Sequence, residues 1–206
     1  MKYLVVFLLL IVGFSCKKKK AEFVLKGVVT DITFDQKHAG AEIKLYQVPV
    51  GSTSEVLIGS GTTGSDGTYS FTFDRDRMEK YIIRVSKPGY FDIEKEVFFS
   101  EMTVSEDNVR NYSTTAKSWV KLTFHNLNPL PNDEFKYIKQ SGKETCSECC
   151  PITEQFYYGA LDTSIYCIND GNTYYSYLYW VIGTTTQGLQ STLTVPFDTT
   201  EIILNY

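Results

Sequence analysis

The sequence contains only two histidines, His38 and His125, and they lie in different parts of a chain of 206 residues. Nucleophile–histidine dyads and most zinc or di-iron sites need more histidine than this. Neither residue is near a serine or cysteine in a motif typical of a catalytic nucleophile. We therefore expect both histidines to face solvent, and we assign no catalytic residue, no metal ligand and no cofactor.

The chain also lacks a hydrophobic run long enough to span a bilayer. Its longest apolar run, Tyr3 to Phe14, has 12 residues, whereas a membrane helix needs about 20. A run of this length after a positively charged start at Lys2 is typical of an export signal. We predict that residues 1–15 are a cleaved signal peptide.

Gly13, Phe14 and Ser15 immediately precede Cys16. This arrangement resembles the lipobox of bacterial lipoproteins, although leucine is commoner at the position of Gly13 and a small residue at that of Phe14. Bacteroidetes lipoproteins tolerate such departures. The resemblance implies cleavage before Cys16, lipid attachment to it, and an outer-membrane lipoprotein facing either the periplasm or the cell surface. In the alternative, an ordinary secretory signal, Cys16 is incidental.

The charge is distributed unevenly along the chain. Lysines occupy all four positions of 17–20, so residues 16–22 form a basic tether. Five of the 20 basic residues lie in the first 20 positions, and the remaining residues carry 15 basic and 24 acidic side chains, a net charge of −9. The tether suits a membrane surface with anionic headgroups, and a solvated spacer is equally compatible with it. An acidic body without a basic patch argues against nucleic-acid binding.

Residues 23–100 alternate and turn repeatedly, which indicates an antiparallel β-sandwich. Residues 41–46 alternate with period two, so Ala41, Ile43 and Leu45 share one face. Asp66-Gly67 predicts a tight hairpin turn before the strand at residues 68–73.

Four motifs in this part of the chain follow one another in a specific order. They are Gly27-Val28-Val29-Thr30-Asp31, Ala39-Gly40-Ala41-Glu42-Ile43-Lys44-Leu45, Thr62-Thr63-Gly64-Ser65-Asp66-Gly67-Thr68-Tyr69-Ser70-Phe71 and Pro88-Gly89-Tyr90. Together they resemble the carboxypeptidase regulatory-like (transthyretin-like) domain, with Gly64 where aspartate is commoner and an insert at residues 48–54. The resemblance implies a seven-stranded β-sandwich that serves as a non-catalytic accessory module.

The remainder of the chain predicts a second sandwich. Residues 101–116 are polar and are expected to form a linker. Strand alternation restarts at Trp119, and Asp170-Gly171 predicts a further tight turn within residues 117–206. The predicted fold class is therefore all-β, with two antiparallel sandwich units after the signal peptide.

Apart from Cys16, all the cysteines lie in the second unit, at Cys146, Cys149, Cys150 and Cys167. An even number of cysteines in an exported protein indicates disulfides. A bond between the adjacent Cys149 and Cys150 would be strained, so we expect Cys167 to bond to one of them and Cys146 to the other. The C-x-x-C spacing of Cys146 and Cys149 leaves zinc as the alternative, although a second such pair is absent.

Residues 174–180 are rich in tyrosine, and strand parity divides them between two faces. Tyr175, Tyr177 and Tyr179 share one face, while Tyr174 and Trp180 share the other. One face belongs to the core, and the remaining one presents a stripe of rings. We take Tyr175, Tyr177 and Tyr179 as candidate ligand-facing aromatics, with cross-strand packing within the sheet as the alternative.

These features favour a non-enzymatic, lipid-anchored cell-envelope protein that acts as a binding or structural accessory module. Its expected partners are the membrane, through the N-terminal lipid, and an envelope protein or a glycan. One alternative is a glycan-binding subunit of an outer-membrane uptake system. Another is an accessory or hydrolytic protein with a site in the second unit, which requires polar groups that converge in a deep pocket.

Overall fold

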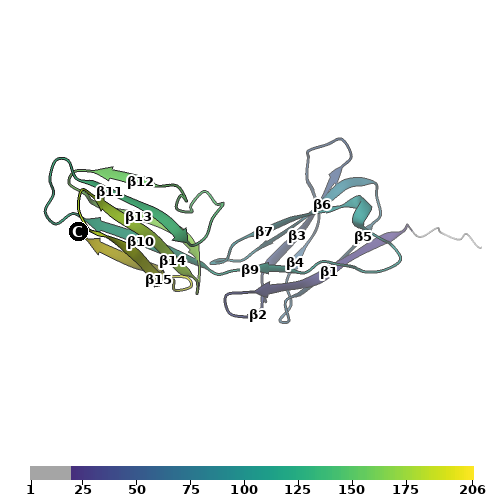
Figure 1. The fold of residues 1–206 in the computed structure, drawn as a ribbon. Coiled ribbons are helices and arrows are strands. Elements are labelled where there is room, and N and C mark those ends of the chain that lie inside the picture. Colours follow the sequence, from purple (N-terminus) through teal and green to yellow (C-terminus); the bar gives the residue numbers. More distant parts are fainter. Residues whose placement is uncertain (1–19) are drawn as a thin grey trace, which may run out of the picture.

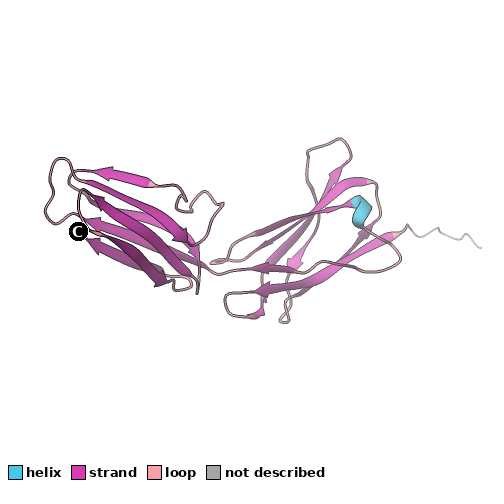
Figure 2. Cartoon of the chain, in the orientation of Figure 1, coloured by secondary structure: helices cyan, strands magenta, loops and turns pink. Residues whose placement is uncertain are grey.

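The computed structural model describes residues 20–206, which fold into two β-sandwich units placed end to end (Figure 1). Within these residues nearly every ordered element is a strand, apart from the 3-10 turn η1 at Phe99–Glu101 (Figure 2). The prediction of an all-β sandwich fold is therefore confirmed. The expected signal peptide 1–15 and Cys16 lie outside the described residues. No helix in the described part is long and apolar enough to cross a bilayer.

The first unit consists of two sheets. One is built around β1, which pairs with β5 and with three short strands, and the other has the order β4-β3-β6-β7. The bounds are β1 Glu22–Asp31, β2 Gln36–Lys37, β3 Glu42–Pro49, β4 Val56–Thr62, β5 Thr68–Asp74, β6 Met78–Ser86, β7 Ile93–Phe98, β8 Asn108–Val109 and β9 Tyr112–Thr114. Within the described residues, the unit has six longer strands and the three short strands β2, β8 and β9, which pair along β1, where seven strands were expected.

Two-residue alternation determines which side chains form the core of this unit. In β1 every second residue from Phe23 onward is buried, including Leu25. In β3 the same rule buries Ile43 and Leu45, which the sequence placed together with Ala41 on one face. Each sheet thus contributes one apolar face to the interior.

Residues 101–116 differ from the linker that was expected, because β8 and β9 run parallel to β1 and belong to the first unit. One polar side chain of this segment satisfies backbone groups of the first unit. The Asn108 side chain donates to the carbonyl oxygens of Val24 at 3.0 Å and Thr103 at 2.9 Å, and it is 4% exposed. The polar character of Asn108 therefore serves internal hydrogen bonding.

The segment that carries β8 and β9 passes so close to β1 that only glycine fits at position 27. A Cβ atom on Gly27 would collide with the carbonyl oxygen of Arg110. Beside it, the backbone N–H of Val28 donates to Oδ1 of Asn111 at 2.9 Å. The first glycine of the motif series is thus required by the close approach of a second chain segment.

The second unit contains seven strands in two sheets, with the orders β13-β10-β16 and β12-β11-β14-β15. Their bounds are β10 Lys117–His125, β11 Glu134–Ser141, β12 Gln155–Tyr158, β13 Asp162–Asp170, β14 Tyr174–Ile182, β15 Gln187–Leu193 and β16 Thr199–Asn205. All these pairings are antiparallel except that of β10 with β16, which is parallel.

Thr115 and Ala116 alone separate β9 from β10, so the two units meet at a short junction. Phe197 from the second unit packs its ring against Phe34 and Tyr90 of the first, with centroid distances of 5.9 and 5.3 Å. The backbone N–H of Ala116 also donates to Oγ1 of Thr33 at 2.8 Å. The junction is therefore packed and hydrogen-bonded rather than a free hinge.

Two residues from separate motifs support the junction from within the first unit. The hydroxyl of Tyr90 donates to the fully buried carboxylate of Asp31 at 2.9 Å. His38 lies edge-on to the Tyr90 ring at 4.4 Å and is 2% exposed. The expectation that His38 faces solvent is therefore wrong, because its turn folds back onto Tyr90.

The sequence predicts that the Asp66-Gly67 turn closes a hairpin, and this prediction is wrong. The strands on either side of the turn belong to different sheets, because β4 pairs with β3 whereas β5 pairs with β1. The turn instead carries the chain from one sheet to the other. Gly67 adopts φ 73°, and a Cβ atom there would lie 2.5 Å from the carbonyl oxygen of Val29. Both the backbone angle and the space demand glycine.

Gly67→Ala should therefore lower the free energy of unfolding by about 1–3 kcal/mol through strain at this turn. Gly61 in β4 is the matched control, because a Cβ atom there meets nothing within 4 Å. Gly61→Ala should stay within about 0.5 kcal/mol of the parent. Urea unfolding followed by circular dichroism measures both, and equal losses would show that Gly67 is not constrained.

Candidate binding surface

The side chains of the tyrosine-rich strand β14 alternate between two faces, as parity predicts. The face predicted to contact a ligand is the one that points into the core. Tyr175 and Tyr177 are 1% and 0% exposed, and Tyr179 packs against the same core. Burial raises the pKa of the Tyr175 and Tyr177 hydroxyls. The assignment of Tyr175, Tyr177 and Tyr179 as ligand-facing aromatics is therefore wrong.

These tyrosines are buried because rings from the opposite sheet and from the neighbouring strand β11 cover them. Phe124 of β10 lies 5.8 Å from the Tyr177 ring in an edge-on arrangement. Tyr137 of β11 approaches the same ring at 5.6 Å. Edge-to-face packing of this kind suits aromatic quadrupoles, and it uses the inward face of β14 entirely for the core.

The other side of this sheet, which we call the outer face, carries the exposed apolar side chains. Tyr158 is 70%, Tyr174 64% and Leu189 59% exposed. Its apolar members come from all four strands and are Ile138, Phe156, Tyr158, Tyr174, Leu178, Trp180, Ile182, Leu189 and Leu193. Exposed apolar side chains gathered on one face mark an interaction site more often than single exposed residues do.

One row of the outer face is built around Lys136. Its cross-strand neighbours are Phe156 on β12 and Trp180 on β14. The Lys136 ammonium lies 5.0 Å from the Trp180 ring centre and 5.9 Å from that of Phe156. A cation held between two rings keeps this lysine stem packed along the apolar row.

Two other outward sheet faces carry ion pairs. In the first unit the Arg84 guanidinium contacts Glu55 at 2.7 Å and Glu94 at 2.6 Å. On the second sheet of the second unit, Lys121 pairs with Glu201 at 2.9 Å. Such pairs are well solvated and contribute little to binding. The outer face differs from both of them in its chemistry.

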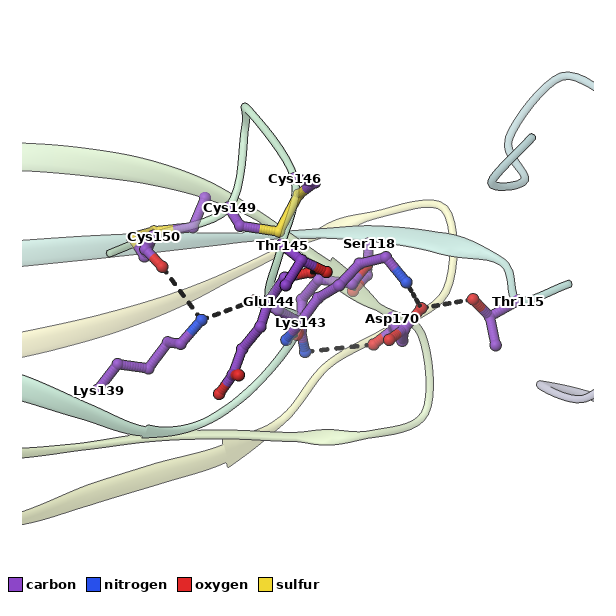
Figure 3. Close-up of a disulfide and its surroundings, with 12 residues drawn as sticks. Thr115, Ser118, Lys139, Lys143, Glu144, Thr145, Cys146, Cys149, Cys150 and Asp170 are labelled. Carbon is purple, nitrogen blue, oxygen red and sulfur yellow. Dashed lines mark hydrogen bonds and ion pairs between the residues drawn. A yellow bond between two sulfur atoms is a disulfide. The ribbon is translucent and has the colours of Figure 1, made fainter. Parts of the chain in front are cut away.

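The loop between β11 and β12 contains Cys146, Cys149 and Cys150 (Figure 3), and Cys167 lies on β13. Cys146 bonds to Cys149 and Cys150 bonds to Cys167, with Cα–Cα distances of 5.1 Å in each pair. This is one of the two pairings that the sequence left open. The described residues hold no group of three or more His, Cys, Asp or Glu placed to bind a metal.

Lys139 is a buried cation that sequence reasoning missed. Its ammonium donates to the carbonyl oxygens of Lys143 at 2.6 Å and Cys150 at 3.1 Å (Figure 3). Burial lowers its pKa. Strand parity was the available signal, because Lys139 follows the inward-facing Phe135 and Tyr137 at two-residue steps. Its contacts hold the disulfide loop against β11.

A hollow of about 180 Å³ lies at the end of the second unit between Asn126, Asp133, Thr184 and Tyr206. Asp133 accepts hydrogen bonds from the backbone N–H of Leu130 and from the Asn126 amide, both at 2.8 Å. Both hydrogen bonds lower the pKa of the Asp133 carboxyl, and the bond from Leu130 has the larger effect. The carboxylate is thus held ionised to close a turn, which does not suit a general acid.

Neither a protein-family model nor any curated protein matches the chain. Among solved structures, it is similar to the Bacillus anthracis TIE protein, with 15% identity, a TM-score of 0.35, and coverage of 90% of this chain but 34% of that protein. The chain thus spans about a third of that structure. The shaft pilin SpaA from Lactobacillus rhamnosus GG shows 11% identity, a TM-score of 0.34, and coverage of 91% and 98%. A hydroxyquinol 1,2-dioxygenase from Pseudomonas putida shows 11% identity, a TM-score of 0.34, and coverage of 48% and 58%.

Tyr177→Phe should raise the free energy of unfolding by about 1 kcal/mol. The Tyr177 hydroxyl is buried without a hydrogen-bond partner among the described residues, and removing it relieves an uncompensated desolvation cost. Tyr69→Phe is the matched control, because the Tyr69 hydroxyl donates to the Arg110 carbonyl at 2.7 Å. That variant should lose about 1 kcal/mol. Thermal unfolding that ranks the two variants in the reverse order would contradict this account.

Dithiothreitol should open the Cys146–Cys149 bridge before the Cys150–Cys167 bridge in the folded protein. Cys150 and Cys167 are 5% and 1% exposed, whereas Cys146 and Cys149 are partly accessible in the loop. Thiol exchange requires access to a sulfur atom. Alkylation at timed intervals followed by mass spectrometry measures the order, and urea-unfolded protein, in which both bridges are accessible, is the control. Simultaneous reduction in the folded state would refute the prediction.

Proposed function

We propose that the protein is a non-enzymatic, lipid-anchored accessory protein of the cell envelope, of the Bacteroidetes type. Lipid on Cys16 and the basic tether at 16–22 would hold it at the outer membrane. The first unit, which resembles a carboxypeptidase regulatory-like domain, acts as a spacer, and the second unit carries the binding surface. The lipobox-like segment before Cys16 and the four motifs of residues 23–100 support this proposal.

The observation that carries the proposal is the outer face of the second unit together with its place in the molecule. β1 begins at the end of the first unit that lies away from the second unit (Figure 1). There Lys20 pairs with Asp74 at 3.1 Å and Asp76 at 3.4 Å. A tether that enters at this end would place the outer face beyond the first unit, at a distance from the membrane.

The polar contacts of the junction suit a spacer, because they restrain the angle between the units. The Asp170 carboxylate accepts the Thr115 hydroxyl and pairs with the Lys143 ammonium, the latter at 2.7 Å. The same ammonium lies 3.8 Å from the centre of the Phe91 ring. Lys143 thus contacts Phe91 of the first unit and Asp170 of the second. Its side chain therefore connects the two units across the junction.

Glycan binding in an outer-membrane uptake system is the second candidate function. Trp180 and Phe156 on the outer face favour it, since exposed rings can stack on the apolar face of a sugar. Trp180 and Phe156 therefore replace Tyr175, Tyr177 and Tyr179 as the candidate glycan-binding residues. A glycan array probed with the parent and Trp180→Ala would support this candidate only if binding were present and then lost.

The anchor is tested by metabolic labelling with an alkyne fatty acid. Parent protein should take up the label, and Cys16→Ala should lose it completely because the acceptor thiol is gone. Ser15→Ala is the matched control, since it keeps a small residue before the cleavage point and should retain the label. Label retained in Cys16→Ala would exclude lipid attachment at this residue.

A further inference from the structure

We infer that the outer face packs against the same face of a second copy of this chain, so that two molecules pair through the β12-β11-β14-β15 sheets. The inference rests on the role of the outer face as a binding surface proposed above. Three properties of that face carry it, namely its relief, its charge and its size.

The outer face has a shape that can match a second copy of itself. The match is centred on the row of cross-strand neighbours at the middle of the face. That row is apolar and consists of Ile138, Leu178 and Leu189, which are cross-strand neighbours. A two-fold axis that lies in the interface along this row would place each of the three residues against its own counterpart. Isologous dimers require a surface that matches itself in this way.

The rows on either side of the middle row differ in size. On one side stand the large side chains of Phe156, Lys136 and Trp180, in register across three strands. On the other side Ser141, Ser176 and Ser191 are in register across three strands.

The two-fold rotation places the large row of one copy over the serine row of the other. The Ser141 and Ser176 hydroxyls already bond to each other at 2.7 Å, so covering them leaves neither without a partner. Large side chains over small ones allow two sheets to approach to the usual separation of about 10 Å.

Charge favours this face over the rest of the surface. Residues 21–206 carry a net charge of −9, so two copies repel each other over most approaches. The charged residues that the four strands direct outward on this face are Glu134 and Lys136, one of each sign. Lys136 also pairs with Glu154 at the rim, at 3.4 Å. Two acidic chains therefore repel each other least when they meet through this nearly neutral apolar face.

The size of the face suits a weak dimer. Its strands have 8 residues in β11, 4 in β12, 9 in β14 and 7 in β15. At a strand spacing of about 4.8 Å and a rise of about 3.4 Å per residue, they cover about 450 Å² per copy. Two such faces bury on the order of 900 Å², which is the size of a weak interface.

Cysteine crosslinking of the detergent-solubilised full chain tests the pairing directly. Leu189→Cys places a thiol on the proposed axis, opposite its own counterpart, and mild oxidation should yield a disulfide-linked species of twice the monomer mass. Ile203→Cys is the matched control, because Ile203 is 54% exposed on the other sheet of the same unit. It should give no such species. Equal crosslinking of both variants, or a Leu189→Cys adduct with a different protein, would overturn the proposal.

A second measurement uses the serine row and needs no added cysteine. Ser191→Trp fills the small row on an exposed strand, so the monomer should fold normally while the partner's large row is blocked. In sedimentation of the detergent-solubilised protein, its dimer dissociation constant should rise at least tenfold over that of the parent. Ile203→Trp should leave it unchanged. A parent that remains monomeric up to about 100 μM, where a modest interface of this class is populated, would also overturn the pairing.

These results are independent of the anchor. Fatty-acid labelling at Cys16 reports the proposed envelope location, whereas crosslinking through Leu189→Cys reports the occupant of the outer face. A labelled protein that does not crosslink refutes the dimer and leaves the anchor standing. Loss of glycan-array binding in Trp180→Ala, with the parent monomeric, assigns the face to a glycan and likewise refutes the dimer.

Discussion

The inward packing of Tyr175 and Tyr177 against Phe124 and Tyr137 determines what the second unit presents to its surroundings. Side chains alternate strictly along a strand, so fixing these two rings in the core fixes the opposite set outside. A slip of one residue in β14 would bury Trp180 and expose Tyr177. The outer face is thus a direct consequence of how the aromatic core is filled.

Strand alternation made much of this predictable, but not which side of β14 is covered. Both of its faces are rich in rings, so composition could not separate them. The deciding information is long-range, since it lies in the β10 and β13 strands that close over one side. Cys167 of β13 joins that core and bonds to Cys150.

The polar segment 101–116 shows a different limit of sequence reasoning. Composition indicated a linker because polar residues usually face water. Here Asn108 replaces water by bonding to backbone groups of β1 and of its own loop. The signal for this was Gly27, since a glycine within a strand often marks the close approach of another backbone. His38 illustrates the same point, because its burial depends on Tyr90, 52 positions later in the sequence.

The junction connects these observations. Asp31 and Tyr90, from the first and last motifs, are hydrogen-bonded to each other inside the first unit. The ring of Tyr90 also packs against Phe197 of the second unit. The motif residues therefore stabilise a contact beyond their own domain. β9 continues into β10 after two residues, and β10 pairs with β13 and β16, so the junction is linked directly to one sheet of the second unit. The contacts of Asp31, Tyr90 and Phe197 therefore help to fix the direction in which the outer face points relative to the first unit.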